Sequence, residues 1–95
     1  MEYLKDYFSS ESISQIEKEV NVDSLYDLEN NEYSVLDNIN YLESLGVKNI
    51  DKLIIHRPDI FINNKEKLEK FFLEHNIHEL VEKINEDVKN IDLFM

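Results

Sequence analysis

The sequence predicts an all-α protein made of stacked short helical hairpins, in about three helix-turn-helix modules that form a small α-solenoid or a compact helical bundle. Apolar residues recur at spacings of three and four along the chain, and no segment alternates apolar and polar residues as a half-buried strand does. The turns Asn21-Val22, Gly46-Val47 and Asn76-Ile77 can also be aligned, and each is followed three residues later by Leu or Ile. Their separations of 25 and 30 residues are usual for helical repeats.

Length and composition favour one domain spanning residues 1–95, with approximate modules at residues 10–30, 34–62 and 63–92. A chain of 95 residues that is 42% hydrophobic can bury one core but not two. The absence of Cys excludes a disulfide framework and thiolate metal sites. No basic leader precedes an apolar run, and no apolar segment approaches the roughly 18 residues of a membrane helix. We therefore expect a soluble, cytoplasmic protein with no membrane association.

The first 30 residues predict three short helices. Ser9 and Ser10 are expected to end the opening helix and to cap the next one, and Asn21 is expected to close the second helix in the left-handed conformation. Asp23 or Ser24 is the expected N-cap of the third helix. The apolar stripes of these helices are Tyr3, Leu4, Tyr7 and Phe8; Ile13, Ile16 and Val20; and Val22, Leu25 and Leu28.

The middle of the chain predicts a helical hairpin. Ser34 with Asp37 resembles a capping box before the first helix, and Gly46, the only glycine, is expected to follow that helix as its C′ residue. Pro58 excludes the α conformation at Arg57, so the second helix is expected to end at about His56. The two apolar stripes are Val35, Leu36, Ile39, Leu42 and Leu45, and then Val47, Ile50, Leu53 and Ile54.

The last third predicts a 3₁₀ turn followed by two helices. The apolar group at residues 60–62 is the expected 3₁₀ turn, and Asn63 with Glu66 is the next capping signal. A turn at Asn76 separates the two helices. Their stripes are Leu68, Phe71 and Phe72, and then Leu80, Val81, Ile84, Val88 and Ile91.

Residues 38–62 resemble the helical repeat of the mitochondrial transcription termination factor family. The resemblance rests on Leu45-Gly46, on the aliphatic residues of the second helix, and on Pro58 followed by Ile60 and Phe61. It implies stacked helical hairpins, and members of that family hold duplex nucleic acid against a basic face. Such binding needs Lys and Arg to neutralise phosphates. The one basic cluster, which we interpret as a solvated helix face, is Lys48, Lys52, Arg57, Lys65, Lys67 and Lys70.

The net charge of −11 lies mostly in the first half of the chain. Residues 1–45 contain eleven acids and only Lys5 and Lys18, whereas residues 46–95 contain ten acids and eight bases. The first half therefore repels nucleic acid and attracts basic protein surfaces, which makes direct nucleic-acid binding unfavourable. The alternative is that the acidity only serves solubility. Tyr26 and Tyr33 stand among these acids, where a Tyr can supply contact area at an interface, while the other aromatic residues are expected in the core.

We expect a non-enzymatic binding protein whose acidic half docks on a basic, nucleic-acid-binding protein. Carboxylates on rigid helices can imitate phosphates, so the protein is expected to be a DNA-mimic inhibitor of the anti-CRISPR or anti-restriction type. The Ile, Asn and Lys content is typical of an AT-rich phage or mobile element. The alternative is an assembly module that forms homo-oligomers or larger complexes through the apolar ends Tyr3, Tyr7 and Phe8, and Leu93, Phe94 and Met95. The expected partner-binding residues are Glu17, Glu19, Asp23, Tyr26, Asp27, Glu29, Glu32, Tyr33 and Asp37.

No catalytic, cofactor or metal site is expected. His75 and His78 could share a helical face, but the predicted turn lies between them and no third ligand has helical spacing. Asp27, Glu29 and Asn31 alternate like the start of a calcium loop, whose required Gly and final Glu are missing. A single glycine cannot form a glycine-rich phosphate loop.

Overall fold

The structure is a computed structural model that describes all residues 1–95, and it confirms the predicted all-α class. It contains no strand. The elements are η1 (Glu2–Leu4), α1 (Ser10–Glu19), α2 (Val22–Glu29), α3 (Glu32–Ser44), α4 (Ile50–His56), α5 (Pro58–Ile62), α6 (Lys65–Leu73), α7 (Ile77–Glu86) and η2 (Val88–Leu93), where η denotes a 3₁₀ helix. No helix combines the length and the apolar character that crossing a membrane requires.

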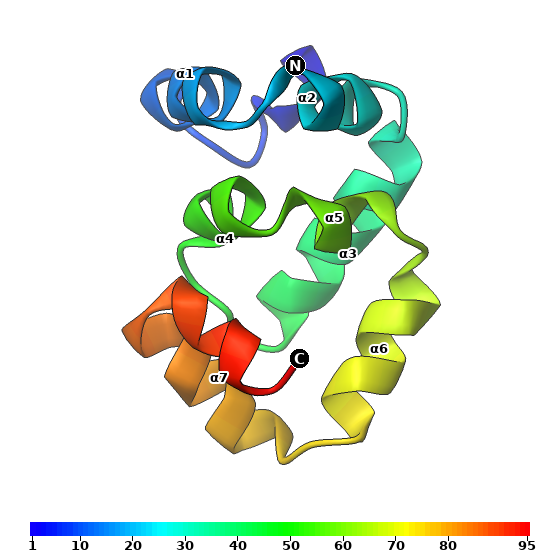
Figure 1. The fold of residues 1–95 in the computed structure, drawn as a ribbon, viewed down its shortest axis with the longest axis vertical. Coiled ribbons are helices and arrows are strands. Elements are labelled where there is room, and N and C mark those ends of the chain that lie inside the picture. The colour runs from blue at the N-terminus through cyan, green and yellow to red at the C-terminus, as the bar shows by residue number, and fades with distance from the viewer.

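The helices pack in layers along the longest axis of a body measuring 33 × 24 × 23 Å. Helices α1 and α2 form a layer at one end (Figure 1), and their main contacts are with α4 and α5 respectively. Helix α3 packs against α5 and α6, and η2 returns to α4. Apart from α3–α5, which lies within the predicted module 34–62, these contacts join helices from different predicted modules. The α1–α2 layer is therefore held by one face and leaves its other face to solvent.

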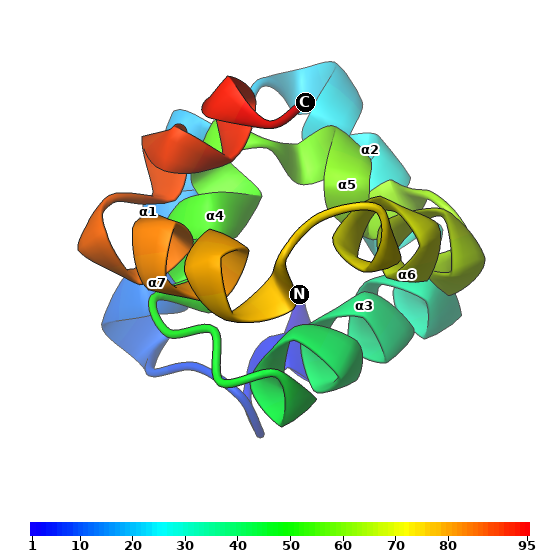
Figure 2. The ribbon, with the colours of Figure 1, turned by 90° about the horizontal axis from the view of Figure 1, so that it is seen from below.

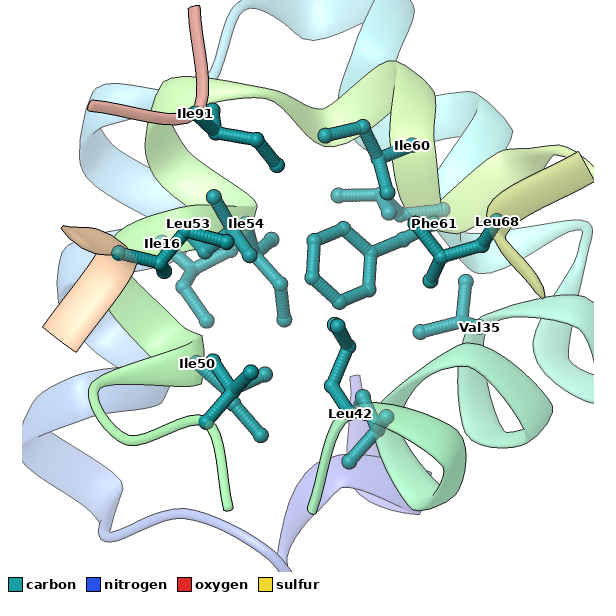
Figure 3. Packing of buried hydrophobic residues seen from close by; sticks show 14 of the residues in the cluster. Ile16, Val35, Leu42, Ile50, Leu53, Ile54, Ile60, Phe61, Leu68 and Ile91 are labelled. Carbon is teal, nitrogen blue, oxygen red and sulfur yellow. The ribbon is translucent and has the colours of Figure 1, made fainter. Parts of the chain in front are cut away.

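Apolar side chains fill the space that the helices surround when the molecule is seen along its long axis (Figure 2). The ring of Phe61 lies at the centre, with Ile54, Val35 and Leu42 around it (Figure 3). Phe61 is fully buried, as is Ile91 of η2, which closes the core from the C-terminal end. The predicted stripes thus supply most of the core.

The end of α3 agrees with the prediction made from Gly46. Gly46 has φ of +88°, and its N–H donates to the carbonyl of Glu43. The N–H of Val47 donates to the carbonyl of Leu42, which completes a Schellman motif with both apolar partners buried. The predicted end of the next helix is also correct, because α4 stops at His56.

The prediction that Asn21 adopts the left-handed conformation is wrong. Asn21 has φ of −66° and serves as the N-cap of α2, where its side-chain oxygen accepts a hydrogen bond from the N–H of Ser24. It therefore replaces Asp23 and Ser24 in the capping role that we had expected of them. Asn76 caps α7 in the same way, through the N–H of Glu79. A short amide side chain reaches the exposed donors of a following helix, so Asn at a turn can begin a helix as well as end one.

Other predicted boundaries are shifted. Helix α3 begins at Glu32, so the predicted capping box of Ser34 and Asp37 lies inside the helix. The opening helix is only the 3₁₀ turn η1, although Ser9 caps α1 as predicted. Such errors arise because capping residues also occur in the first helical turns.

Residues 60–62, predicted as a 3₁₀ turn, belong to the short α-helix α5 (Pro58–Ile62), which has Pro58 at its first position. The cap before α6 is Asn64 rather than Asn63. The last helix breaks at Asp87, whose extended backbone and side-chain cap begin η2. The sequence predicted one continuous helix there because Val88 keeps the apolar period.

Asn38 is a fully buried polar residue inside α3. Its Nδ2 donates to the carbonyl oxygens of Phe61, at 3.0 Å, and Asn63, at 2.8 Å, while its Oδ1 has no partner. The side chain thus binds α3 to the end of α5, where backbone carbonyls lack helical partners. The sequence analysis missed this role, although Asn38 lies three residues after Val35 and four before Leu42, on the apolar side of α3.

An ion-pair network fixes η2 to the α4–α5 junction. Arg57 contacts Asp59 through Nε and Nη2, both at 3.0 Å, and its Nη1 contacts Asp92 of η2 at 2.9 Å. His56 also lies 2.7 Å from Asp92. The contacts with His56 and then Arg57 lower the pKa of Asp92, and the contact with Arg57 lowers that of Asp59. A separate hydrogen bond joins α7 to the chain after α3: Asn85 donates to the carbonyl of Gly46.

Candidate interaction surface

All nine predicted partner-binding residues are exposed. They lie on the first three α-helices, which carry most of the acidic half of the chain. We call this set the acidic surface: Glu17 and Glu19 of α1; Asp23, Tyr26, Asp27 and Glu29 of α2; and Glu32, Tyr33 and Asp37 of α3.

Helix α2 brings three of these residues onto one side. Leu28 is buried and Leu25 is half-buried, so the core lies on their side of the helix. Asp23, Tyr26 and Asp27 are spaced by three and four residues and lie on the solvent side. Figure 1 shows α2 at one end of the molecule, beside the N-terminal segment.

Glu17 and Glu29 are brought together from different helices. The amino group of Met1 lies 3.4 Å from the carboxylate of Glu17 and 3.1 Å from that of Glu29. Its hydrogen bond to Glu29 is the largest of the effects that raise the pKa of this amino group. These two acids thus join α1 to α2 through a cation of the chain itself.

The remaining members of the acidic surface are spread over other faces. Glu19 accepts a hydrogen bond from Gln15 on α1. Tyr33 and Asp37 lie one turn apart on α3, on the side opposite the buried Val35. Because α3 runs away from the α1–α2 layer, Asp37 lies farther from α2 than Glu32 does (Figure 1). The structure thus gathers the centre of the surface on α2 and leaves its edges dispersed.

None of the seven carboxylates in the acidic surface pairs with a Lys or Arg side chain. Lys5, one of the two lysines in the first half, pairs with Glu2 at 2.8 Å. Acids of the second half are more often paired, as Asp59 and Asp92 are with Arg57. The acidic surface therefore has no ion pair with a Lys or Arg side chain.

Val22 was predicted to lie in the core, and this is wrong. Its side chain is 80% exposed. A rotation of about 100° per residue places Val22 well away from the direction that Leu25 and Leu28 define, so three residues in a helical stripe need not all be buried. The overlooked signal is its spacing of four from Tyr26, which is 68% exposed and lies on the same outer side.

The predicted exposed apolar end at Tyr3, Tyr7 and Phe8 is also wrong. All three are half-buried against the core. Tyr3 donates its hydroxyl to the carbonyl of Leu28 at 2.6 Å, and burial is the main cause that raises its pKa. Tyr7 donates to Asn40 of α3. These hydroxyls attach the N-terminal segment to α2 and α3.

At the other end, Leu93 and Met95 are exposed as predicted. Phe94 is half-buried, with its ring 5.6 Å from that of His75. Only part of the C-terminal apolar end is therefore open to solvent.

The other candidate groups are dispersed or occupied. No three His, Cys, Asp or Glu side chains lie close enough together to hold a metal ion. His75 contacts the carbonyl of Phe71 through Nδ1, and His78 is exposed beside Glu82. Asp27 belongs to α2, and the side chain of Asn31 donates to its carbonyl, so residues 27–31 form a helix end rather than a calcium loop.

Comparison with family models, curated proteins and solved structures finds no match for this chain. The residues that resemble the mitochondrial transcription termination factor repeat have structural positions here: Gly46 turns the chain, Pro58 begins α5, and Ile60 and Phe61 are buried. The resemblance stays a prediction, and the function is inferred from the acidic surface itself.

Proposed function

We propose that this chain is a non-enzymatic binding protein whose acidic surface docks on a basic site of another protein. The observation that carries the proposal is the state of the seven carboxylates, which are exposed and make no pair with Lys or Arg, while acids elsewhere do. Only Glu17 and Glu29 are paired, with the amino group of Met1. A patch with an excess of one sign steers an oppositely charged partner towards it and makes association fast and salt-sensitive.

The partner that this chemistry fits best is a nucleic-acid-binding protein, so the chain would act as a DNA-mimic inhibitor of the kind encoded by phages and mobile elements. A protein that binds phosphates presents Lys and Arg in rows. Asp23 and Asp27 lie one helical turn apart, about 6 Å, on a fixed scaffold and can meet such a row without ordering a flexible segment. The AT-rich residue usage supports this setting.

Assembly through apolar ends is the alternative function. The half-buried state of Tyr3, Tyr7 and Phe8 removes one of its two predicted contact regions. What is left is the C-terminal end, where Leu93 and Met95 are exposed. The acidic surface is thus the larger unoccupied feature, and we favour it over self-assembly.

The test compares two triple variants that remove the same charge from different places. One changes the acidic surface by Asp23→Asn, Asp27→Asn and Glu32→Gln. The control changes the other half by Glu66→Gln, Glu74→Gln and Glu79→Gln. Each set removes two acids from first helical turns, so the loss of helix-dipole stabilisation there is similar. The third acid is Asp27 within α2 in one set and Glu74, the C-cap residue of α6, in the other. Glu17 and Glu29 are left unchanged because they hold the amino group of Met1.

Each immobilised variant is incubated with lysate of a low-GC bacterium at about 50 and about 500 mM salt, where screening lengths fall from about 14 to about 4 Å. We expect the wild type and the control to capture a basic protein at low salt and the acidic-surface variant to fail to capture it. Duplex DNA should displace the captured protein from the wild type. Capture that is equal for both triple variants refutes docking through the acidic surface. Capture that duplex DNA does not displace refutes mimicry but keeps the docking.

A further inference from the structure

The outer side of α2 carries exposed apolar side chains as well as carboxylates. Val22, Tyr26 and Tyr33 are 80%, 68% and 88% exposed, and they make up half of the six large hydrophobic side chains that the fold leaves open. Single exposed hydrophobic residues are normal on a protein surface. Here, however, all three fall within residues 22–33, the segment that also contains the centre of the acidic surface.

Helix geometry arranges two of these side chains, Val22 and Tyr26, into a stripe with acidic borders on α2. Val22 and Tyr26 are four residues apart, so their Cβ atoms lie about 6 Å apart on one side of the helix. At about 100° per residue, Asp23 and Asp27 follow along one border of this stripe and Glu29 lies along the other. We call this stripe with its three acids the α2 face.

The apolar stripe and the border of Asp23 and Asp27 are exposed, and of the three acids in the α2 face only Glu29 binds another part of the chain, the amino group of Met1. The opposite side of α2 is the one that packs, through Leu25 and Leu28, and its main contact is with α5. Figure 1 places α2 at the outer end of the long axis. The stripe and the border of Asp23 and Asp27 are therefore open to a partner on a helix of eight residues, or about 12 Å.

We infer that the α2 face binds a basic amphipathic helix of the partner protein. This inference rests on the proposed function, because it names the part of a basic partner that docks. A surface that only imitates phosphates has no use for exposed Val and Tyr. An amphipathic helix presents apolar residues at spacings of three and four with Lys or Arg beside them, which complements both the apolar stripe and its acidic borders.

Tyr26 is the central contact in this arrangement. Its ring lies between the two borders, and an aromatic side chain is the most effective kind of anchor in a small interface. Val22 extends the apolar contact by one turn towards the start of α2. Charge on the borders sets the approach of the partner, while the stripe selects the apolar side of the incoming helix.

The probes for the test are two synthetic peptides of the same Lys and Leu composition, each about 14 residues or roughly four helical turns long. In one, the Leu residues recur at spacings of three and four, and in the other their order is scrambled so that no apolar face forms. Binding is measured by fluorescence anisotropy at about 50 mM salt, with Tyr26→Ser and Val22→Ser as test variants. Leu73→Ser is the control, because Leu73 is 73% exposed on α6.

We expect the amphipathic peptide to bind the wild type at least about 10-fold more tightly than the scrambled peptide. Tyr26→Ser should remove most of this difference and Val22→Ser part of it, while Leu73→Ser changes it less than about twofold, as truncation outside an interface does. Circular dichroism of each variant checks that the fold is intact, which is expected because all three positions are exposed.

Equal binding of the two peptides overturns the inference, and so does an affinity difference that Tyr26→Ser leaves unchanged. If Tyr26→Ser instead abolishes self-association in sedimentation, the occupant is a second copy of the chain and the inference is also wrong. The triple variant Asp23→Asn, Asp27→Asn and Glu32→Gln separates this failure from that of the proposed function. If it weakens both peptides, acidic docking stands without helix selection, and if it weakens neither, acidic docking fails too.

Discussion

Replacing the buried Asn38 gives a stability change whose size follows from its contacts. Nδ2 makes two hydrogen bonds: losing the one to Phe61 leaves a buried carbonyl without this donor, at a cost of about 1–3 kcal/mol, and losing the one to Asn63 costs about 1 kcal/mol net. In Asn38→Leu, removal of the unpartnered Oδ1 offsets about 1–2 kcal/mol of this. We expect Asn38→Leu to be less stable than the wild type by about 2 kcal/mol.

Asn38→Asp should be worse at neutral pH and should recover in acid. A carboxylate there is buried and faces two carbonyl oxygens, which both raise its pKa above the value of about 3.9 in the unfolded chain. A group whose folded pKa is raised binds its proton more tightly when folded. Its penalty of about 3–5 kcal/mol, typical of an unpaired buried charge, is therefore complete above the folded pKa and disappears below about pH 4.

Urea unfolding followed by circular dichroism measures both effects. A chain of this length has a free energy of unfolding of about 5–14 kcal/mol, so either change is a large fraction of it. With a urea dependence of about 1–2 kcal/mol per molar, Asn38→Leu should lower the midpoint by about 1–2 M. Asn40→Asp is the matched control, because Asn40 is exposed on the same helix and keeps an acceptor for Tyr7.

The reasoning is refuted if Asn38→Leu stays within about 0.5 kcal/mol of the wild type, which is the range of surface substitutions. It is also refuted if the difference between Asn38→Asp and the wild type does not shrink as the pH is lowered.

Three further changes test other parts of the fold. Gly46→Ala should lose about 1–2 kcal/mol in urea unfolding and Gly46→Asn less, because an added Cβ meets no atom within 4 Å and the strain of positive φ is the whole cost. Tyr3→Phe should lose about 1 kcal/mol, since the carbonyl of Leu28 loses its donor; no change in the thermal midpoint would contradict this. The pKa values of Asp59 and Asp92 are lowered by folding, so their contribution is present above the unfolded pKa of about 4 and is lost as the pH falls through the folded values. Asp92→Asn should accordingly flatten the acid side of the stability curve between about pH 4 and pH 2, and an unaltered curve would refute the role of the network.

The helical class and the core stripes could be predicted because they depend on local periodicity. Gly46 and Pro58 were informative for the same reason, since each restricts the backbone at its own position. The capping asparagines were harder to interpret, because Asn21 suits both the end of one helix and the start of the next. Whether Asn21 ends one helix or begins the next depends on the direction of the chain around it, and tertiary packing sets that direction.

Contacts between distant segments left no local pattern in the sequence. Asn38 reaches α5 across more than 20 residues, and Arg57 reaches η2 across 35. The exposure of Val22 depends on which side of α2 faces the core, and the packing of Leu28 against the rest of the molecule sets that side. The acidic residues of the candidate surface were found from charge counting alone, whereas the apolar stripe between them needed the orientation of the helix.

Reliance on asparagine has a consequence for chemical ageing. Asparagine is a thermolabile residue, and its slow deamidation replaces the amide with a carboxylate. At the caps Asn21, Asn64 and Asn76 the side chain acts as an acceptor, and aspartate does this equally well, so the product should fold unchanged. At Asn38 and Asn85 the amide is a donor between distant segments, and the same reaction breaks the contact. The amides of Asn30, Asn31, Asn63 and Asn90 are also donors, to carbonyls nearby in the chain. Old preparations should therefore lose stability through damage at donor asparagines rather than at the caps.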